Sequence, residues 1–479
     1  MPSDATTNNW YDAARTLRPS SSGATNWALV SYLGRANYSL KDKYLFTVTG
    51  RTDGSSRFGH NNKWAFFPSA AFAWRVSEEP FMQRQSLFGD LKVRLSYGKT
   101  GNQAVDPYNS LSRLGICWYS LAGTEINALC PSGTRGNPDL KWETQRQLNV
   151  GIDATVLRGR IAFSVDAYHS VTNDLLLSVP LPATSGFSSQ LRNIGSVQNN
   201  GVELSVTTVN VSTGRLAWRS TLNVAHNRSR VLDLGTATQI FPGVRGGGFV
   251  EGGQTHIVRV GEPLGAIFGF KTIGLWQQGD TCPLTNAADC TPGEYKIVDV
   301  NGDGKIDLND RTIVGYADPK LYGGLSNSLS YGPFSLDVFM NFSYGNQVVD
   351  MSRVFNGLST GFMNERADVL NRWTPQNTNT DIPRANFARP RRIYSALVED
   401  GSFLRLQTLT LGYQLPSRLL RGAKAGRVYI TGQNLLIATN YTGFDPEVNS
   451  MGGDPRTRGV DDGAYPRSRV WNFGVSLTF

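Results

Sequence analysis

The last thirteen residues, Arg467–Phe479, constrain the fold of this chain more than any other stretch. Side chains alternate between the two faces of a β-strand. One face of this segment is therefore wholly apolar and the other mostly small and polar; the apolar set is Trp471, Phe473, Val475, Leu477 and Phe479. A chain that ends on phenylalanine directly out of such a strand is unusual for a soluble domain, whose ends are commonly polar and frayed. The pattern favours a barrel strand between lipid and water, and the alternative is an inner strand of a soluble β-sandwich.

The same alternation recurs in runs that are longer than ordinary strands. Between Phe334 and Tyr344 the even positions are apolar, while Ser335, Asp337, Asn341 and Ser343 lie on the other face. Runs of more than ~10 residues are about twice the usual strand length and match a tilted strand that spans a membrane. A sandwich needs an apolar inner face, whereas a water-filled lumen accepts a polar one. We therefore expect an all-β fold, an antiparallel transmembrane β-barrel. Further runs cover residues 43–57, 64–79, 89–102, 147–156 and 161–168.

Short and long connections alternate along the chain, as they do between the two rims of an outer-membrane barrel. The short ones are 39–43, 157–160, 211–215, 261–265 and 331–333. The long ones are 101–140, 174–195, 231–255, 277–319, 351–399 and 441–466. We count about fifteen strands, an odd number, whereas complete bacterial barrels have an even number. An open edge would leave backbone groups unpaired in lipid. We therefore expect residues 27–479 to form the C-terminal portion of a larger barrel, with residues 1–26 as the remnant of an external loop and with no plug.

Composition excludes several other classes of protein. Lys and Arg exceed Asp and Glu by 47 to 38, a net charge of +9 that is dispersed, so a nucleic-acid partner is not expected. No apolar run reaches the ~18 residues of a membrane helix, and the N-terminus does not read as a signal peptide. The sequence shows no recognisable arrangement of a catalytic nucleophile, a base and a residue that orients the base, so we do not expect an enzyme.

Several phrases along the strands resemble the SusC/RagA family of TonB-linked outer-membrane proteins, in the order of that family. They include RTDGSSRF at 51–58, LSYGKTGN at 95–102, NPDLKWE at 137–143, NNGVE at 199–203 and GSFLRL at 401–406. The resemblance implies the barrel of a TonB-dependent receptor in the bacterial outer membrane, with about 22 strands around a plug. It also implies import of an oligosaccharide or glycan, or of a peptide, together with a SusD-like surface lipoprotein and the TonB complex. If about fifteen strands are present, about seven are missing. The alternatives are a passive porin-like channel and a secreted all-β carbohydrate-binding or adhesion module.

Residues 299–310 fit the twelve-residue calcium loop. The ligand positions one, three, five, seven, nine and twelve are Asp299, Asn301, Asp303, the carbonyl of Lys305, Asp307 and Asp310. Gly304 stands at the sharp turn, and the clustered carboxylates would repel one another without a cation. The flanks lack amphipathic helices, so we expect a structural calcium ion that staples a loop. Magnesium, which demands stricter geometry, and an ordinary Asx-rich turn are the alternatives.

The four cysteines form two close pairs, Cys117 with Cys130 and Cys282 with Cys290, each in a long connection. We expect two disulfides in an oxidising compartment, and the alternative is four free thiols.

Aromatic residues in the long connections either stack on sugar rings or anchor the loops; they are Trp118, Tyr119, Trp276, Phe362 and Tyr441. The substrate-binding residues are not identified by these patterns.

Overall fold

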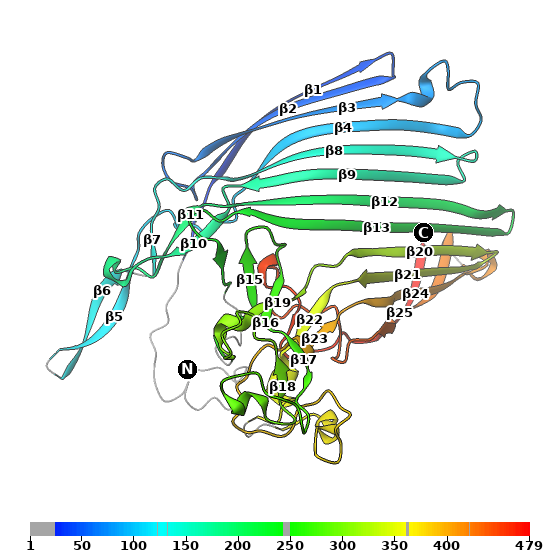
Figure 1. The fold of residues 1–479 in the computed structure, drawn as a ribbon. Coiled ribbons are helices and arrows are strands. Elements are labelled where there is room, and N and C mark those ends of the chain that lie inside the picture. The colour runs from blue at the N-terminus through cyan, green and yellow to red at the C-terminus, as the bar shows by residue number, and fades with distance from the viewer. Residues whose placement is uncertain (1–23, 122, 132, 243–249, 361–363, 421) are drawn as a thin grey trace.

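The computed structural model describes residues 24–121, 123–131, 133–242, 250–360, 364–420 and 422–479 (Figure 1). Thirteen strands form one antiparallel sheet in which each strand pairs with the next member along the chain. In sheet order they are β1 (Leu29–Leu40), β2 (Tyr44–Ser55), β3 (Trp64–Arg75), β4 (Phe88–Asn102), β8 (Glu143–Val156), β9 (Ile161–Asn173), β12 (Ser196–Thr213), β13 (Leu216–Asp233), β20 (Leu321–Tyr331), β21 (Phe334–Tyr344), β24 (Phe403–Gln414), β25 (Ala425–Thr439) and β27 (Val470–Thr478).

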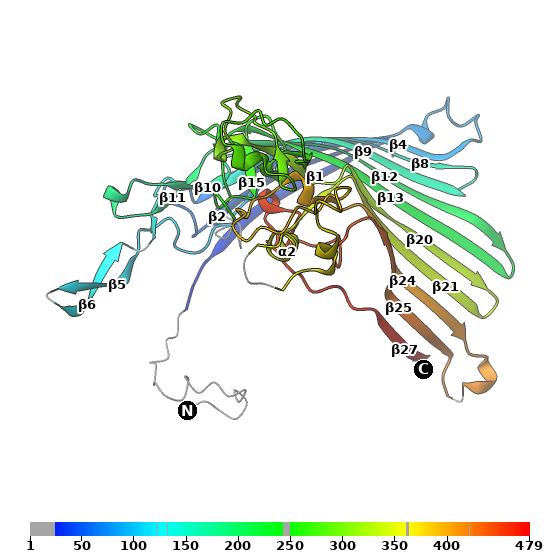
Figure 2. The ribbon, with the colours of Figure 1, turned by 60° about the horizontal axis from the view of Figure 1, so that its bottom comes forward.

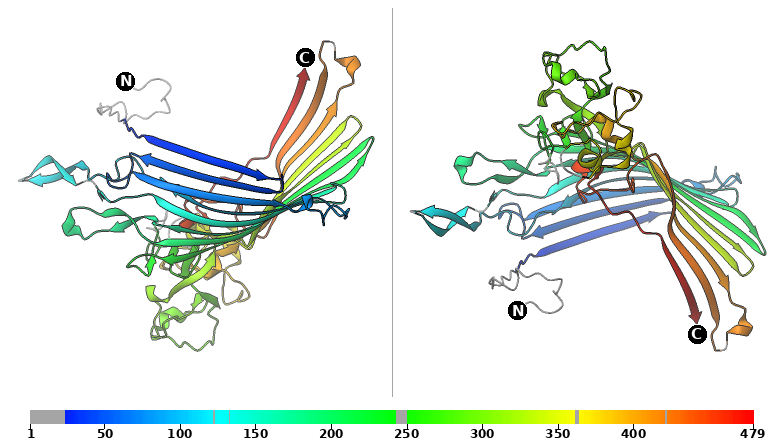
Figure 3. Two further views of the ribbon diagram at one scale, coloured as in Figure 1. Left: turned by 90° about the horizontal axis from the view of Figure 1, so that it is seen from above. Right: turned by 90° about the horizontal axis from the view of Figure 1, so that it is seen from below.

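The sheet curves into an open trough, and β1 and β27 lie at its two separate edges (Figure 3). Neither edge strand has a second partner among the described strands. The short turns lie at one end of the strands and the long connections at the other (Figure 1). The expected asymmetry between two rims is therefore present.

The two faces of the sheet differ in chemistry, as β8 illustrates. Leu148, Val150 and Ile152 point to the convex side and are 41%, 45% and 40% exposed. Their neighbours Asn149 and Asp153 point to the concave side, where the structure pairs them with Ser96 and Lys92 of β4. A soluble protein would cover such a broad apolar belt. Lipid covers it in an outer-membrane barrel, so the sandwich alternative does not fit.

The expectation of about fifteen barrel strands is wrong by two, because β15 (His256–Arg259) and β16 (Ala266–Phe270) are not in the barrel sheet. We expected the turn 261–265 between them to be a short barrel turn. Both strands instead belong to a four-stranded sheet with β14 (Gln239–Ile240) and β19 (Arg311–Tyr316). Residues on both faces of β15 and β16 are buried, which suits a small core and not a lipid boundary. The number of barrel strands observed in the described residues, thirteen, is still an odd number.

The long connections build an external-loop unit, which we define as the described residues within 234–320, 345–402 and 440–469. Figure 2 shows it gathered at the end of the strands opposite to the short turns. Its further strands are β17 (Thr272–Leu275), β18 (Tyr295–Ile297), β22 (Gln347–Asp350), β23 (Val398–Asp400) and β26 (Val460–Asp461), and its α-helix is α2 (Met351–Asn356). The three connections share one hydrophobic core, with Phe270 from the first, Met351 and Tyr394 from the second and Val460 from the third. They are therefore packed together and do not hang separately.

The earlier connections form smaller sheets, namely β5 (Leu114–Leu121) with β6 (Thr124–Pro131), and β10 (Leu176–Pro180) with β11 (Ser189–Asn193) and β7 (Thr134–Arg135). Single 3-10 turns are η2 (Val76–Glu78), η3 (Ala183–Ser185), η5 (Ala287–Cys290), η6 (Leu308–Asp310), η7 (Ala367–Asn371), η8 (Ser395–Leu397), η9 (Ser417–Leu419) and η10 (Pro455–Thr457). No helix in the described ranges is long and apolar enough to cross a membrane. Most of the expected remnant 1–26 lies outside the described residues; only residues 24–26 are inside them.

Candidate functional site

The concave wall carries a compact ionic cluster on β4, β8 and β9. The Arg94 guanidinium donates to Asp153 at 2.8 Å and to Asp166 at 2.8 Å, and Lys92 Nζ lies 2.9 Å from Asp153. Each cation thus has a carboxylate partner on a neighbouring strand. The cluster fixes the wall and leaves little free charge there.

A cavity of about 580 Å³ lies where the concave face of β20 and β21 meets the loop that precedes β26. The wall contributes Tyr322, Phe339 and Asn341, and the loop contributes Glu447, Asn449 and Arg458. Phe339 alternates with Asp337 and Asn341, so it faces the interior, and it is 40% exposed. The carboxamide oxygen of Asn341 is buried and has no hydrogen-bond partner among the described residues. The cavity thus offers the aromatic face of Phe339, while the Asn341 oxygen is an unpaired acceptor buried in the wall beside it.

A second cavity, of about 680 Å³, adjoins the first across Pro319. It opens where β13 extends beyond β20, since their pairing ends at Ala225 and Tyr322. Its lining is charged and polar: His226, Arg228, Glu262, Tyr316, Asp318, Lys320, Gln347 and Asp400. Burial raises the pKa of Asp318, although its 3.0 Å contact with Arg458 opposes that effect. This cavity is suited to polar groups of either charge.

A buried histidine positions Arg458, which lines the first cavity. His256 is fully buried, with Nε2 2.8 Å from the Arg458 carbonyl oxygen and Nδ1 2.9 Å from Thr255 Oγ1. Burial lowers the pKa of His256 to about 4, so the imidazole is neutral at neutral pH. The ring therefore joins β15 to the segment before β26 without adding a charge.

Ion pairs tie the external connections together. Arg389, whose side chain is 2% exposed, donates through Nε to Glu294 at 2.8 Å and also donates to the carbonyl oxygens of Leu358 and Arg384. Arg353 donates to Glu399 at 2.8 Å. Burial raises the pKa of the neighbouring Tyr394 hydroxyl, which stays protonated. These contacts hold the loops in one arrangement above the cavities.

In the expected calcium loop, Asp299 and Asp310 accept hydrogen bonds from the loop's own backbone. Asp299 accepts hydrogen bonds from the N–H groups of Gly302 (2.7 Å) and Gly304 (2.8 Å), and Asp310 accepts from Val300 (2.9 Å) and Asp307 (2.8 Å). Gly304 has φ +78°, a conformation that favours glycine. In the described part of the chain, no group of three or more Asp, Glu, His or Cys side chains is placed to hold a metal. The residue types fit a hard cation, but the side chains serve as Asx-type caps of the backbone.

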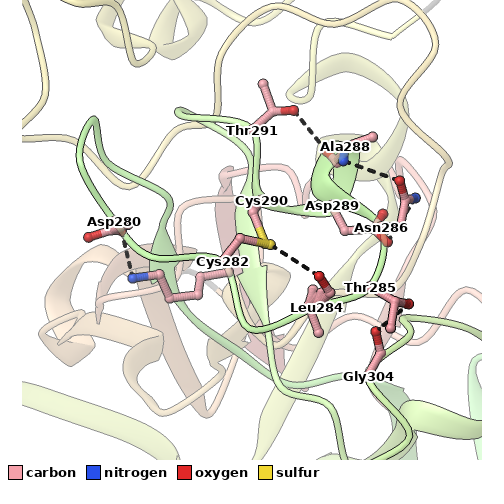
Figure 4. Close-up of a disulfide and its surroundings, with 11 residues drawn as sticks. Asp280, Cys282, Leu284, Thr285, Asn286, Ala288, Asp289, Cys290, Thr291 and Gly304 are labelled. Atoms are coloured by element: carbon pink, nitrogen blue, oxygen red, sulfur yellow. Dashed lines mark hydrogen bonds and ion pairs between the residues drawn. A yellow bond between two sulfur atoms is a disulfide. The ribbon is translucent and has the colours of Figure 1, made fainter.

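One of the two expected disulfides is present. Cys282 and Cys290 are joined, with their Cα atoms 5.6 Å apart (Figure 4). The loop they close contacts the Asp-rich loop, because the Thr285 N–H and hydroxyl both donate to the Gly304 carbonyl oxygen, at 2.7 and 2.9 Å. The disulfide and the Asp-rich loop thus form one local structure.

The other expected disulfide is absent, because Cys117 and Cys130 are free thiols. The register of the β5–β6 hairpin places Cys117 opposite Ala128, and Cys130 opposite Gly115. The two cysteines are diagonal neighbours, and such a pair is farther apart than a disulfide needs. The hydrogen bond with Cys117 raises the pKa of the Cys130 thiol.

Two of the proposed sugar-stacking aromatics anchor the loops instead. Trp276 and Tyr441 are 4% and 5% exposed, and the Tyr441 hydroxyl donates to Asp461 at 2.7 Å. Trp118 is exposed on β5. Phe362 and the side chain of Tyr119 lie outside what the structure describes. The sequence reasoning missed Phe339, although an aromatic residue within the polar inward series of β21 was a usable signal.

The fold and these cavities define the wall of an outer-membrane barrel with a packed external-loop unit. A family model described as TonB dependent receptor-like, beta-barrel matches residues 2–435. TonB-dependent receptor P26 of Formosa agariphila is 38% identical over 480 residues, which is 98% of this chain and 48% of the relative. TonB-dependent receptor SusC of Bacteroides thetaiotaomicron is 31% identical over 492 residues, 99% of this chain and 46% of the relative. The structure of the RagAB peptide transporter superposes with a TM-score of 0.79 at 29% identity, over 95% of this chain and 48% of that one.

The chain belongs to the TonB-dependent receptor β-barrel family, among its SusC-like members. This is a family of outer-membrane receptors and transporters, not of enzymes. The chain spans about half the length of the curated relatives it matches.

Proposed function

We propose that this chain is the C-terminal barrel portion of a SusC-like importer that carries an oligosaccharide, or alternatively a peptide, across the outer membrane. The observation that supports it is the 580 Å³ cavity on the inner side of the wall, which the Phe339 ring and the Asn341 amide line. An aromatic face suits the apolar side of a sugar ring or an apolar side chain, and the amide suits a hydroxyl or a peptide N–H. Energy would come from the TonB complex acting on a plug in the complete protein.

The external-loop unit is proposed to receive a SusD-like surface lipoprotein. Support comes from large apolar side chains that the long connections expose strongly. Leu370, Phe444 and Tyr465 are 84%, 76% and 93% exposed. A partner that covers such side chains would remove them from water.

The Phe339→Ala variant of the complete protein is expected to bind the imported oligosaccharide about fivefold more weakly, since a lost aromatic contact is worth roughly 1 kcal/mol. Asn341→Ala should act in the same direction. Binding is measured by titration of oligosaccharide and peptide pools into the purified protein. The matched control is Phe334→Ala on the same strand, because Phe334 lies on the convex face and is 52% exposed. Equal losses in all three variants would contradict the assignment of the cavity, and uptake without TonB would favour a passive channel.

We propose further that the loop 299–310 takes up calcium when its carboxylates release the backbone N–H groups. The spacing of the oxygen ligands supports the proposal. Millimolar calcium is expected to raise the melting temperature of the wild type, and a chelator should reverse the rise. Asp303→Asn should abolish the rise, while Asn309→Ala, outside the ligand positions, should retain it. An unchanged melting temperature in the wild type would leave an Asx-stapled loop that needs no metal.

A further inference from the structure

Two like charges face each other on the convex side of the barrel wall. Lys99 of β4 and Arg146 of β8 are direct cross-strand partners. On that face, each lies next to an exposed apolar residue: Lys99 beside Tyr97 and Arg146 beside Leu148. Both lie three residues from the end of the strand that leads to a long connection. They therefore stand just above the apolar belt, at the external rim.

This arrangement is unfavourable without a counter-charge, because like charges directly opposite each other destabilise an antiparallel pair. Among the described residues, neither side chain has an ion-pair or hydrogen-bond partner. On the concave face of the same two strands, a cation is paired with an acid, Lys92 with Asp153. In the described strands, no such acid stands opposite Lys99 or Arg146. A bound anion would therefore stabilise this pair of cations.

The two cations line a hollow in the wall. Beyond the pair Ser69–Gly98, β3 no longer pairs with β4, and a cavity of about 390 Å³ opens there. Its lining includes Lys99, Arg146, Lys141, Thr144, Asp174, Trp64 and Phe66. Asp174 is the single acid among the lining residues that the structure describes, and Lys141 already engages it at 2.9 Å. Three cations and one carboxylate leave an excess of positive charge.

We infer that this hollow binds the phosphorylated headgroup of a lipid in the outer leaflet. Its position at the upper border of the apolar belt is the depth of lipid headgroups. Lysine and arginine are the usual partners of phosphate, and basic pockets in membrane walls bind anionic headgroups. Trp64 and Phe66, 54% and 59% exposed on the same face, border the hollow on its external side, and aromatic rings suit the membrane–water interface.

The experiment uses the complete barrel protein, purified in detergent and freed of bound lipid, and titrates it with bisphosphorylated lipid A. The wild type should bind this lipid at least about tenfold more tightly than dephosphorylated lipid A, and the double variant Lys99→Gln/Arg146→Gln should lose about tenfold in affinity. The matched control is Lys41→Gln/Arg158→Gln, which removes two exposed cations from the short turns. It should bind like the wild type.

Thermal unfolding distinguishes a lipid site from a structural role. Without lipid, the double variant should melt no lower than the wild type, because it removes the opposed charges. Lipid A should then raise the melting temperature of the wild type and of the control but not that of the double variant. The inference is overturned if the double variant binds as the wild type does, if it melts lower without lipid, or if inorganic phosphate at equal concentration binds as tightly as the lipid.

Discussion

The Arg389→Met variant is expected to destabilise the external-loop unit by about 3–5 kcal/mol, the usual cost of breaking a buried ion pair by removing one partner. Methionine keeps much of the volume. It removes the buried cation beside the Glu294 carboxylate, which keeps only Asn386 and the more distant Arg384, and it removes the Arg389 donors to the carbonyl oxygens of Leu358 and Arg384. These partners belong to different segments of the unit, so the loss should loosen several loops together.

Hydrogen exchange read by mass spectrometry measures this effect segment by segment. Exchange should accelerate in residues 277–319 and 351–399 and stay unchanged in the barrel strands. Arg384→Met is the matched control, because Arg384 pairs with the same Glu294 from 3.5 Å with a side chain 41% exposed. Exposed pairs are worth at most about 1 kcal/mol. If the two variants behaved alike, burial of Arg389 would not be what holds the unit together.

The barrel strands were predictable because their signal is local. Each strand alternates polar and apolar residues over many positions, and no distant contact is needed to read it. The two strands that were misplaced lack that alternation. Residues 266–270 are apolar throughout except for a glycine, and every one of them is buried. Such a run signals a strand covered on both faces, and the short turn before it concealed the signal.

The candidate site was much less predictable, because it depends on distant contacts. The spacing of Asp299, Asp303 and Asp310 gives the ligand types of a calcium loop, but not whether the carboxylates turn inward or cap the backbone. The separation of Cys117 and Cys130 could not reveal the hairpin register that places them diagonally. The cavity beside Phe339 exists only because a loop more than one hundred residues later packs over β21.

Replacing Val150 by arginine tests whether the convex face of the barrel wall meets lipid. The positions assigned to both cavities and to the cationic hollow depend on that assignment. Val150 is near the middle of β8, points to the convex face and has Leu95 and Ala167 as cross-strand neighbours. Arginine near the bilayer midplane costs about 2–4 kcal/mol on the lipid face of a barrel. We therefore expect Val150→Arg to lower the free energy of unfolding of the complete protein by that amount and to reduce its assembly in the outer membrane.

The neighbouring variant Asn149→Arg supplies the control, since it adds the same side chain one position away on the concave face. There the charge meets water and polar neighbours such as Ser96 and Tyr168, so the cost should be under about 1 kcal/mol. Urea unfolding in lipid vesicles and gel mobility before and after heating measure both variants. A larger loss of unfolding free energy for Asn149→Arg would mean that the concave face meets lipid. The cavity beside Phe339 would then face lipid, and the cationic hollow at Lys99 would face water. Because period-two alternation permits no third arrangement, this one pair of substitutions decides which side of the wall meets lipid.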